Sequence, residues 1–138
     1  MAQPVDEIAT YLAAYSPTLS LTVGTNLFKF ALTPSPDAQT VLIPYGGLEP
    51  EGGFGKDGIR WEHTRLQVIC RGATRDHRTP AAKAEAIWLA LGKVEAESLS
   101  GTFYHRAWPI QSPNHLGTDA NGRPMIGFNV DVYRDLGV

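Results

Sequence analysis

The chain has 138 residues, a length typical of one domain that buries about two-thirds of the surface of its unfolded form. Its formal net charge of −2 gives no general attraction to nucleic acid or to an anionic membrane. The single cysteine, Cys70, excludes an internal disulfide framework, and the longest apolar runs fall short of the roughly 18 residues of a bilayer span. We expect a soluble single domain over residues 1–138, made in a reducing cytoplasm.

The first third of the chain predicts one helix and two strands. Apolar side chains recur at helical spacing in residues 4–15, with Asp6 and Glu7 in the first turn, and the helix is expected to end before Pro17. Residues 26–33 and 40–45 predict two strands separated by a proline-rich turn. We expect the second strand to return beside the first as a hairpin.

Residues 46–58 predict a protruding loop, because they hold six glycines in thirteen positions. An ordered helix or strand there loses about 0.5–1 kcal/mol per glycine relative to alanine. One hypothesis is an arm that becomes ordered against a neighbouring surface, and the alternative is a loop that packs Phe54 on its own domain. We expect deletion of residues 47–58 to leave the fold intact and to abolish assembly.

The centre of the chain, residues 61–91, predicts a buried strand followed by a helix. Alternate residues of the strand face the core, and these are Thr64, Leu66, Val68 and Cys70. After a turn at residues 72–78, Thr79 is expected to cap a helix that begins at Pro80. The helix has an apolar stripe formed by Ala84, Ile87, Trp88 and Leu91.

The last third predicts two more strands. Gly92 is placed to end the helix, and Val94 and Leu99 indicate that helical structure continues briefly after it. Residues 103–110 alternate as a strand, and Asn121-Gly122 predicts a turn before a final strand whose inward residues are Ile126, Phe128, Val130 and Val132. The expected fold is α+β. A mainly antiparallel sheet of four to five strands has two helices packed on one face, in the order α-β-β-β-α-β-β.

Searches for catalytic or ligand chemistry find no complete motif. The loop glycines are followed by Lys56-Asp57, where a phosphate-binding loop needs lysine and then serine or threonine. A calcium loop in the register of Asp119 has no carboxylate at its first or last position. The four histidines lack the short fixed spacing of zinc ligands. We therefore expect no enzymatic activity, no cofactor and no metal.

One charge pattern stands out in residues 56–78, where six basic and three acidic residues give a local charge of +3. One interpretation is a solvated strand face and loop. A second is a basic patch that pairs with an acidic patch on an identical copy, which guides docking. DNA contact is a third interpretation, weakened because the segment has neither interleaved aromatic residues nor a recognition helix.

The layout of residues 27–133 resembles that of a known protein family. A glycine-rich loop (PYGGLEPEGGFGKDGIRWE) precedes the strand and helix VICRGATRDHRTPAAKAEAIWLAL, and a hairpin turning at GTDANGRP ends in the strand MIGFNVDVY. This order resembles the minor capsid or tail terminator (tail completion) proteins of long-tailed bacteriophages. The resemblance implies a structural virion protein that caps the tail tube as a ring, typically of six copies, at the head-proximal end of the tail. It implies as partners further copies of the chain, the tail tube protein and the head-tail connector, without a membrane or sequence-specific nucleic acid.

Side-chain chemistry indicates where such a protein would meet its partners. Aromatic residues dominate buried interface centres, and arginines pair well with carboxylates. We therefore expect seven interface residues, which are Tyr45, Phe54, Trp61, Arg71, Arg75, His77 and Arg78. The competing hypothesis is a small soluble cytoplasmic enzyme or ligand-binding domain that acts as a monomer or dimer.

Overall fold

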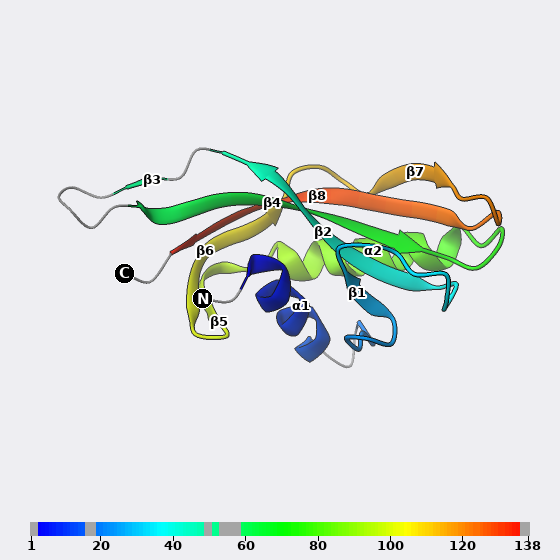
Figure 1. The fold of residues 1–138 in the computed structure, drawn as a ribbon, viewed down its shortest axis with the longest axis horizontal. Coiled ribbons are helices and arrows are strands. Elements are labelled where there is room, and N and C mark those ends of the chain that lie inside the picture. The colour runs from blue at the N-terminus through cyan, green and yellow to red at the C-terminus, as the bar shows by residue number, and fades with distance from the viewer. Residues whose placement is uncertain (1–2, 16–18, 49–50, 53–58, 136–138) are drawn as a thin grey trace.

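The computed structural model describes residues 3–15, 19–48, 51–52 and 59–135, which form two helices and one mixed sheet. The helices are α1 (Pro4–Ala14) and α2 (Arg78–Leu91). The strands are β1 (Leu27–Lys29), β2 (Gln39–Gly47), β3 (Glu51–Gly52), β4 (Ile59–Arg71), β5 (Glu95–Leu99), β6 (Thr102–Pro109), β7 (Asn114–Thr118) and β8 (Pro124–Asp135). Both helices lie on the same face of the sheet (Figure 1). The α+β class is confirmed, but the sheet has more strands than the four to five expected. The order is α-β-β-β-β-α-β-β-β-β rather than α-β-β-β-α-β-β, because one extra strand precedes α2 and two extra strands follow it.

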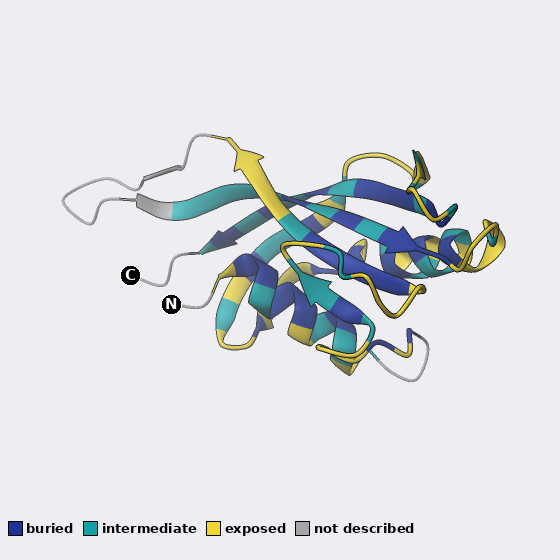
Figure 2. Ribbon diagram, turned by 45° about the vertical axis from the view of Figure 1, so that its right-hand side comes forward, coloured by how far each residue is buried: buried dark blue, intermediate teal, exposed yellow. Residues whose placement is uncertain are grey.

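The sheet is organised around β4 and β8, which pair antiparallel along almost their whole length. The strand order is β1-β2-β4-β8-β6-β5, while β3 pairs with β4 and β7 pairs with β8. Leu66 and Val68 of β4 lie opposite Val130 and Phe128 of β8, and all four side chains are buried under the helices. Fully burying a side chain of this kind contributes about 1.5–3 kcal/mol. Buried residues therefore line both central strands (Figure 2). The predicted inward residues are confirmed except for Thr64, which is half-buried.

The start of α2 differs from the prediction. The helix begins at Arg78, and Thr79 is already its second residue. Asp76 supplies the capping interaction instead, because its Oδ1 accepts the backbone amide of Thr79 at 3.1 Å. Hydrogen bonds from Thr79 lower the pKa of the Asp76 carboxyl. The helix ends at Leu91 with Gly92 as its C-cap, as predicted.

The segment after Gly92 is a strand rather than the short helical continuation expected. It forms β5, which pairs antiparallel with β6. Val94 and Leu99 are buried, but the four positions between them are exposed. Pairing with β6 has therefore outweighed the weak helical spacing of these two residues.

β1 and β2 do not form the expected hairpin, because they pair in parallel. β1 has only three residues and ends before Phe30, whose φ of 77° takes the backbone out of strand geometry. Residues 30–38 then carry the chain back, so that β2 starts beside β1 and runs in the same direction. The Ser35-Pro36 peptide bond in this connection is cis.

The alternation predicted for residues 103–110 is interrupted by an irregularity. A register shift between Tyr104 and Arg106 places Tyr104 and Ala107 together in the core, although the sequence pattern put them on opposite faces. Trp108 and Arg106 face away from the helices. The hairpin that joins β7 to β8 is confirmed, with Gly122 in a left-handed conformation at its turn.

Candidate interaction surfaces

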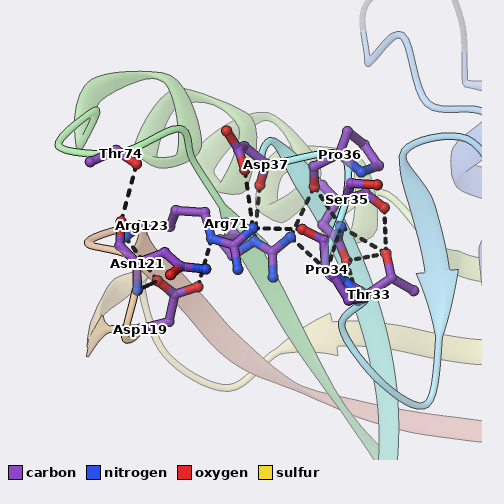
Figure 3. Close-up of polar contacts among 11 residues, drawn as sticks. Thr33, Pro34, Ser35, Pro36, Asp37, Arg71, Thr74, Asp119, Asn121 and Arg123 are labelled. Carbon is purple, nitrogen blue, oxygen red and sulfur yellow. Dashed lines mark hydrogen bonds and ion pairs between the residues drawn. The ribbon is translucent and has the colours of Figure 1, made fainter.

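Arg71, a predicted interface residue, is buried and holds the connection between β1 and β2. Its Nη2 donates to the carbonyl oxygens of Thr33 and Pro36 at 2.7 and 2.9 Å, and its Nε donates to that of Asp37 at 2.9 Å (Figure 3). Burial lowers the pKa of this guanidinium, and the neighbouring charge of Arg123 acts in the same direction. Because these donors are used within the chain, we remove Arg71 from the residues available to a partner.

Arg123 is a second buried guanidinium beside Arg71, and the sequence analysis did not identify it. Its Nε donates to Asp119 Oδ2 at 2.7 Å, while its Nη1 contacts the Pro34 carbonyl at 2.7 Å and Asp37 Oδ1 at 3.0 Å (Figure 3). Arg123 therefore ties the turn between β7 and β8 to the connection between β1 and β2. We call these two arginines with their carbonyl and carboxylate partners the arginine clamp. The carbonyl oxygens of this irregular segment are satisfied by guanidinium groups, which supply several donors in one plane.

Arg75, His77 and Arg78 lie on the surface at the start of α2, as expected for residues that contact a partner. All three are exposed. Their side chains form no ion pair with any described residue, and His77 lies beside the ring of His115, with centroids 5.5 Å apart. We call this group of three the basic corner. Its role as an interface stays a prediction.

The predicted aromatic anchors lie elsewhere. Tyr45 on β2 is exposed and Trp61 on β4 is half-buried, whereas Phe54 lies outside the described residues. Tyr45 is paired with Arg65, four residues further along β4 than Trp61. The predicted set is therefore distributed over separate surfaces rather than gathered in one site.

The sheet face opposite the helices carries a row of stacked rings that crosses three strands. His63 of β4 stacks on Tyr133 of β8 with centroids 4.1 Å apart, and His105 of β6 stacks on the other side at 4.5 Å. Phe103 meets His105 edge to face at 5.0 Å. We call these four rings the aromatic row. The sequence pattern did not single out these four rings, and only the strand register shows that they are neighbours.

Charged and apolar groups extend this uncovered face beside the aromatic row. Arg106 Nη2 pairs with Asp131 Oδ2 at 2.8 Å, and the same guanidinium lies 5.9 Å from the ring centre of Trp108. Trp108 and Ile110 are both exposed large apolar side chains. A face with aromatic, arginine and exposed apolar side chains has the composition of a protein interface.

A cavity between the sheet and the start of α2 contains the single cysteine. It has a volume of about 210 Å³ and is lined by Cys70, Thr40 and Lys83 among other residues. Burial raises the pKa of the Cys70 thiol to about 11, so the thiolate needed by a nucleophile is scarce at neutral pH. Within the described ranges, no group of three or more histidine, cysteine, aspartate or glutamate residues is placed to hold a metal ion. No described helix is long and apolar enough to cross a bilayer.

Comparison with known proteins decides among the hypotheses. A family model described as "Bacteriophage tail terminator protein" matches residues 12–133. The chain belongs to the bacteriophage tail terminator family. A chain in the solved structure "Virion of native gene transfer agent (GTA) particle" has the same fold, with a TM-score of 0.63 and 16% sequence identity. The match covers 97% of this chain and 99% of that chain. No curated protein sequence matches.

Membership in the tail terminator family assigns the chain to the virion as a structural tail protein rather than an enzyme. The resemblance seen in the sequence over residues 27–133 is confirmed by a family match of nearly the same extent. The buried thiol and the exposed aromatic and basic groups agree with this role, because a structural subunit needs contact surfaces and no reactive centre.

Proposed function

We propose that this tail terminator caps the tail tube as a closed ring, typically of six copies, at the head-proximal end, and joins it to the head connector. A ring closes through heterologous contacts, in which one face of a subunit meets a different face of the next. Such a subunit requires at least two distinct contact surfaces besides those for the tube and the connector. The described part of the chain offers the uncovered sheet face and the basic corner as candidates.

The observation that carries the proposal is the uncovered sheet face. In a monomer, the solvent-exposed face of an antiparallel sheet is commonly polar. Here that face instead holds the aromatic row, together with exposed Trp108 and Ile110. Aromatic side chains supply large contact areas when they are buried against a partner. Covering this face in an assembly accounts for its composition.

The first experiment measures assembly of the purified chain, alone and with purified tail tubes, by light scattering after size exclusion and by negative-stain imaging. We expect rings, either free or formed on the ends of tubes. A strictly monomeric or dimeric species that fails to bind tubes favours the small soluble enzyme or ligand-binding domain instead. Labelling the C-terminus in purified virions locates the subunit, and we expect label only where the tail meets the head.

The glycine-rich segment can be tested without disturbing the sheet. Gly47 pairs with Thr64, and Gly52 pairs with Ile59, so removal of all residues 47–58 would also break strand pairing. Replacing only residues 53–58 by Asn-Gly leaves a two-residue turn between Gly52 and Ile59. We expect this variant to keep its circular dichroism spectrum and to lose ring assembly. Loss of the folded spectrum would show that the segment belongs to the core.

A further inference from the structure

The edge strand β5 carries two carboxylates that form no ion pair with a residue in the described part of the chain. β5 ends the strand order and, among the described strands, pairs only with β6. Glu95 and Glu97 are exposed, and neither forms an ion pair with a described residue. Two cations close to β5 in sequence or in strand register have other partners. Lys93 donates to the Tyr15 hydroxyl at 3.0 Å, and Arg106, opposite Glu95, pairs with Asp131.

The basic corner is complementary in charge to this edge, and its two arginines likewise form no ion pair with a described residue. Asp76 is the carboxylate nearest to Arg75 and Arg78 in sequence, and it accepts the Thr79 amide. Asp119 and Asp37 belong to the arginine clamp, where both contact Arg123. The basic corner therefore offers two guanidinium groups to carboxylates of another copy, and guanidinium groups bind carboxylates in a bidentate geometry.

The two charged surfaces lie at opposite ends of α2. The basic corner surrounds the first residue of α2, and β5 begins four residues after its last. The 14 residues of α2 span about 21 Å, and the helix runs along the long axis of the subunit (Figure 1). Opposite charges on opposite ends favour a head-to-tail arrangement of identical subunits and disfavour pairing of like ends.

We infer that the acidic edge formed by Glu95 and Glu97 of one copy docks on the basic corner of the next copy around the ring. This inference rests on the proposed ring and names one of its subunit contacts. Two different surfaces meet at every junction, so the contact is heterologous and closes a ring when the rotation between neighbours divides the circle evenly. Two copies that meet in the wrong orientation repel each other, because either two acidic edges or two basic corners then face one another.

A different reading of Glu95 and Glu97 is protection of an edge strand, since charges on an edge prevent uncontrolled strand pairing. Lysine protects an edge as well as glutamate does, so charge reversal separates the two readings. The double variant E95K/E97K keeps the edge charged and loses complementarity with the basic corner. If protection is the whole role, that variant assembles like the wild type.

The test uses E95K/E97K and a second variant, R75E/R78E, each checked for a wild-type circular dichroism spectrum. Each variant alone presents like charges at every junction, and we expect the concentration for half-assembly to rise about tenfold or more. An equimolar mixture restores complementarity at every junction when the two variants alternate. We therefore expect the mixture to form rings with an even number of subunits and a one-to-one composition, measured by native mass spectrometry.

The outcomes separate this inference from the proposed function. Rings formed by the wild type and by E95K/E97K at the same concentration would overturn the contact and leave the ring in place. Failure of the mixture to assemble, when each variant is folded, would also overturn the contact. Absence of rings and tube binding for the wild type would overturn both. In support, assembly of the wild type should weaken with rising salt, because exposed charge pairs are screened.

Discussion

Arg134 near the end of β8 and Glu7 in the first turn of α1 form a buried ion pair, with Nη1 and Oε1 2.8 Å apart across 127 residues of sequence. Their side chains are only 5% and 2% exposed. Glu7 also accepts hydrogen bonds from the Tyr104 hydroxyl at 2.7 Å and the Thr102 hydroxyl at 2.6 Å. The N-terminal helix is thus fixed to the sheet by a carboxylate whose oxygens are both satisfied.

Replacing Glu7 with glutamine should destabilise the fold strongly. The amide keeps the shape of the side chain but leaves the Arg134 charge buried without its main counter-charge, for which we expect a loss of about 3 kcal/mol in the free energy of unfolding. Asp6→Asn is the matched control, because the pair of Asp6 with Lys29 is partly exposed and contributes about 0–1 kcal/mol. Urea unfolding compares them, and equal losses would contradict the role of the buried pair.

Arg71→Lys should destabilise the arginine clamp although the charge is kept. A lysine ammonium cannot reproduce the planar set of donors that reaches Thr33, Pro36 and Asp37, so we expect a loss of about 2 kcal/mol. Arg75→Lys is the control on the exposed loop beside it, with an expected change within about 0.5 kcal/mol. Equal unfolding midpoints for both variants in urea would show that the clamp adds no stability.

Gly127→Ala should be harmful because β8 passes close to β4 at this position. A Cβ on Gly127 would lie 2.3 Å from the carbonyl oxygen of Val68 and 2.9 Å from Leu116 Cδ1. Relief requires a backbone shift between the two central strands, with a cost of about 1–3 kcal/mol. Gly92→Ala is the control, because its φ of −61° suits alanine and the nearest atoms are 3.5 Å away. Thermal unfolding should show Gly92→Ala unchanged or slightly stabilised.

The fold should lose stability in alkaline solution. Burial raises the pKa of the Tyr104 hydroxyl, helped by its bond to Glu7, and burial raises the pKa of Cys70 to about 11. Both groups are neutral when protonated, and their pKa values are lower in the unfolded chain than in the folded one. The unfolded chain therefore ionises first, as the pH rises above the ordinary pKa values of 9.0 for Cys70 and 10.0 for Tyr104. Their stabilising effect is complete below those values and is lost as the pH rises toward the folded pKa.

Urea unfolding at a series of pH values measures this loss, at about 1.4 kcal/mol per pH unit for each titrating group. Tyr104→Phe should be less stable than the wild type at neutral pH, since Glu7 loses a donor, but its stability should fall less steeply above pH 10. Tyr45→Phe is the control on the exposed surface and should follow the wild-type curve. If the stability of Tyr104→Phe fell as steeply above pH 10 as that of the wild type, ionisation of Tyr104 would not be a cause of the alkaline loss.

The helices and the inner faces of β4 and β8 were predictable, because each depends on a local period. Side chains at helical spacing mark α1 and α2, and strict alternation marks the buried residues of the two central strands. The layout of these elements also carried the family resemblance, which the match over residues 12–133 confirms. Interface residues were harder to predict, because neither the expected exposure of a residue nor its aromatic character shows which surfaces of the molecule lie next to each other.

The sequence by itself determined most of the apolar residues that are buried in α1, β4, α2 and β8, since a helical or strand period can be read from a few consecutive side chains. Only the tertiary structure decided that β1 and β2 run parallel, that Arg71 is used inside the chain, and that Tyr104 joins Ala107 in the core. Each of these depends on a partner far along the chain. An arginine that donates to distant carbonyls has the same local sequence as one that points into water.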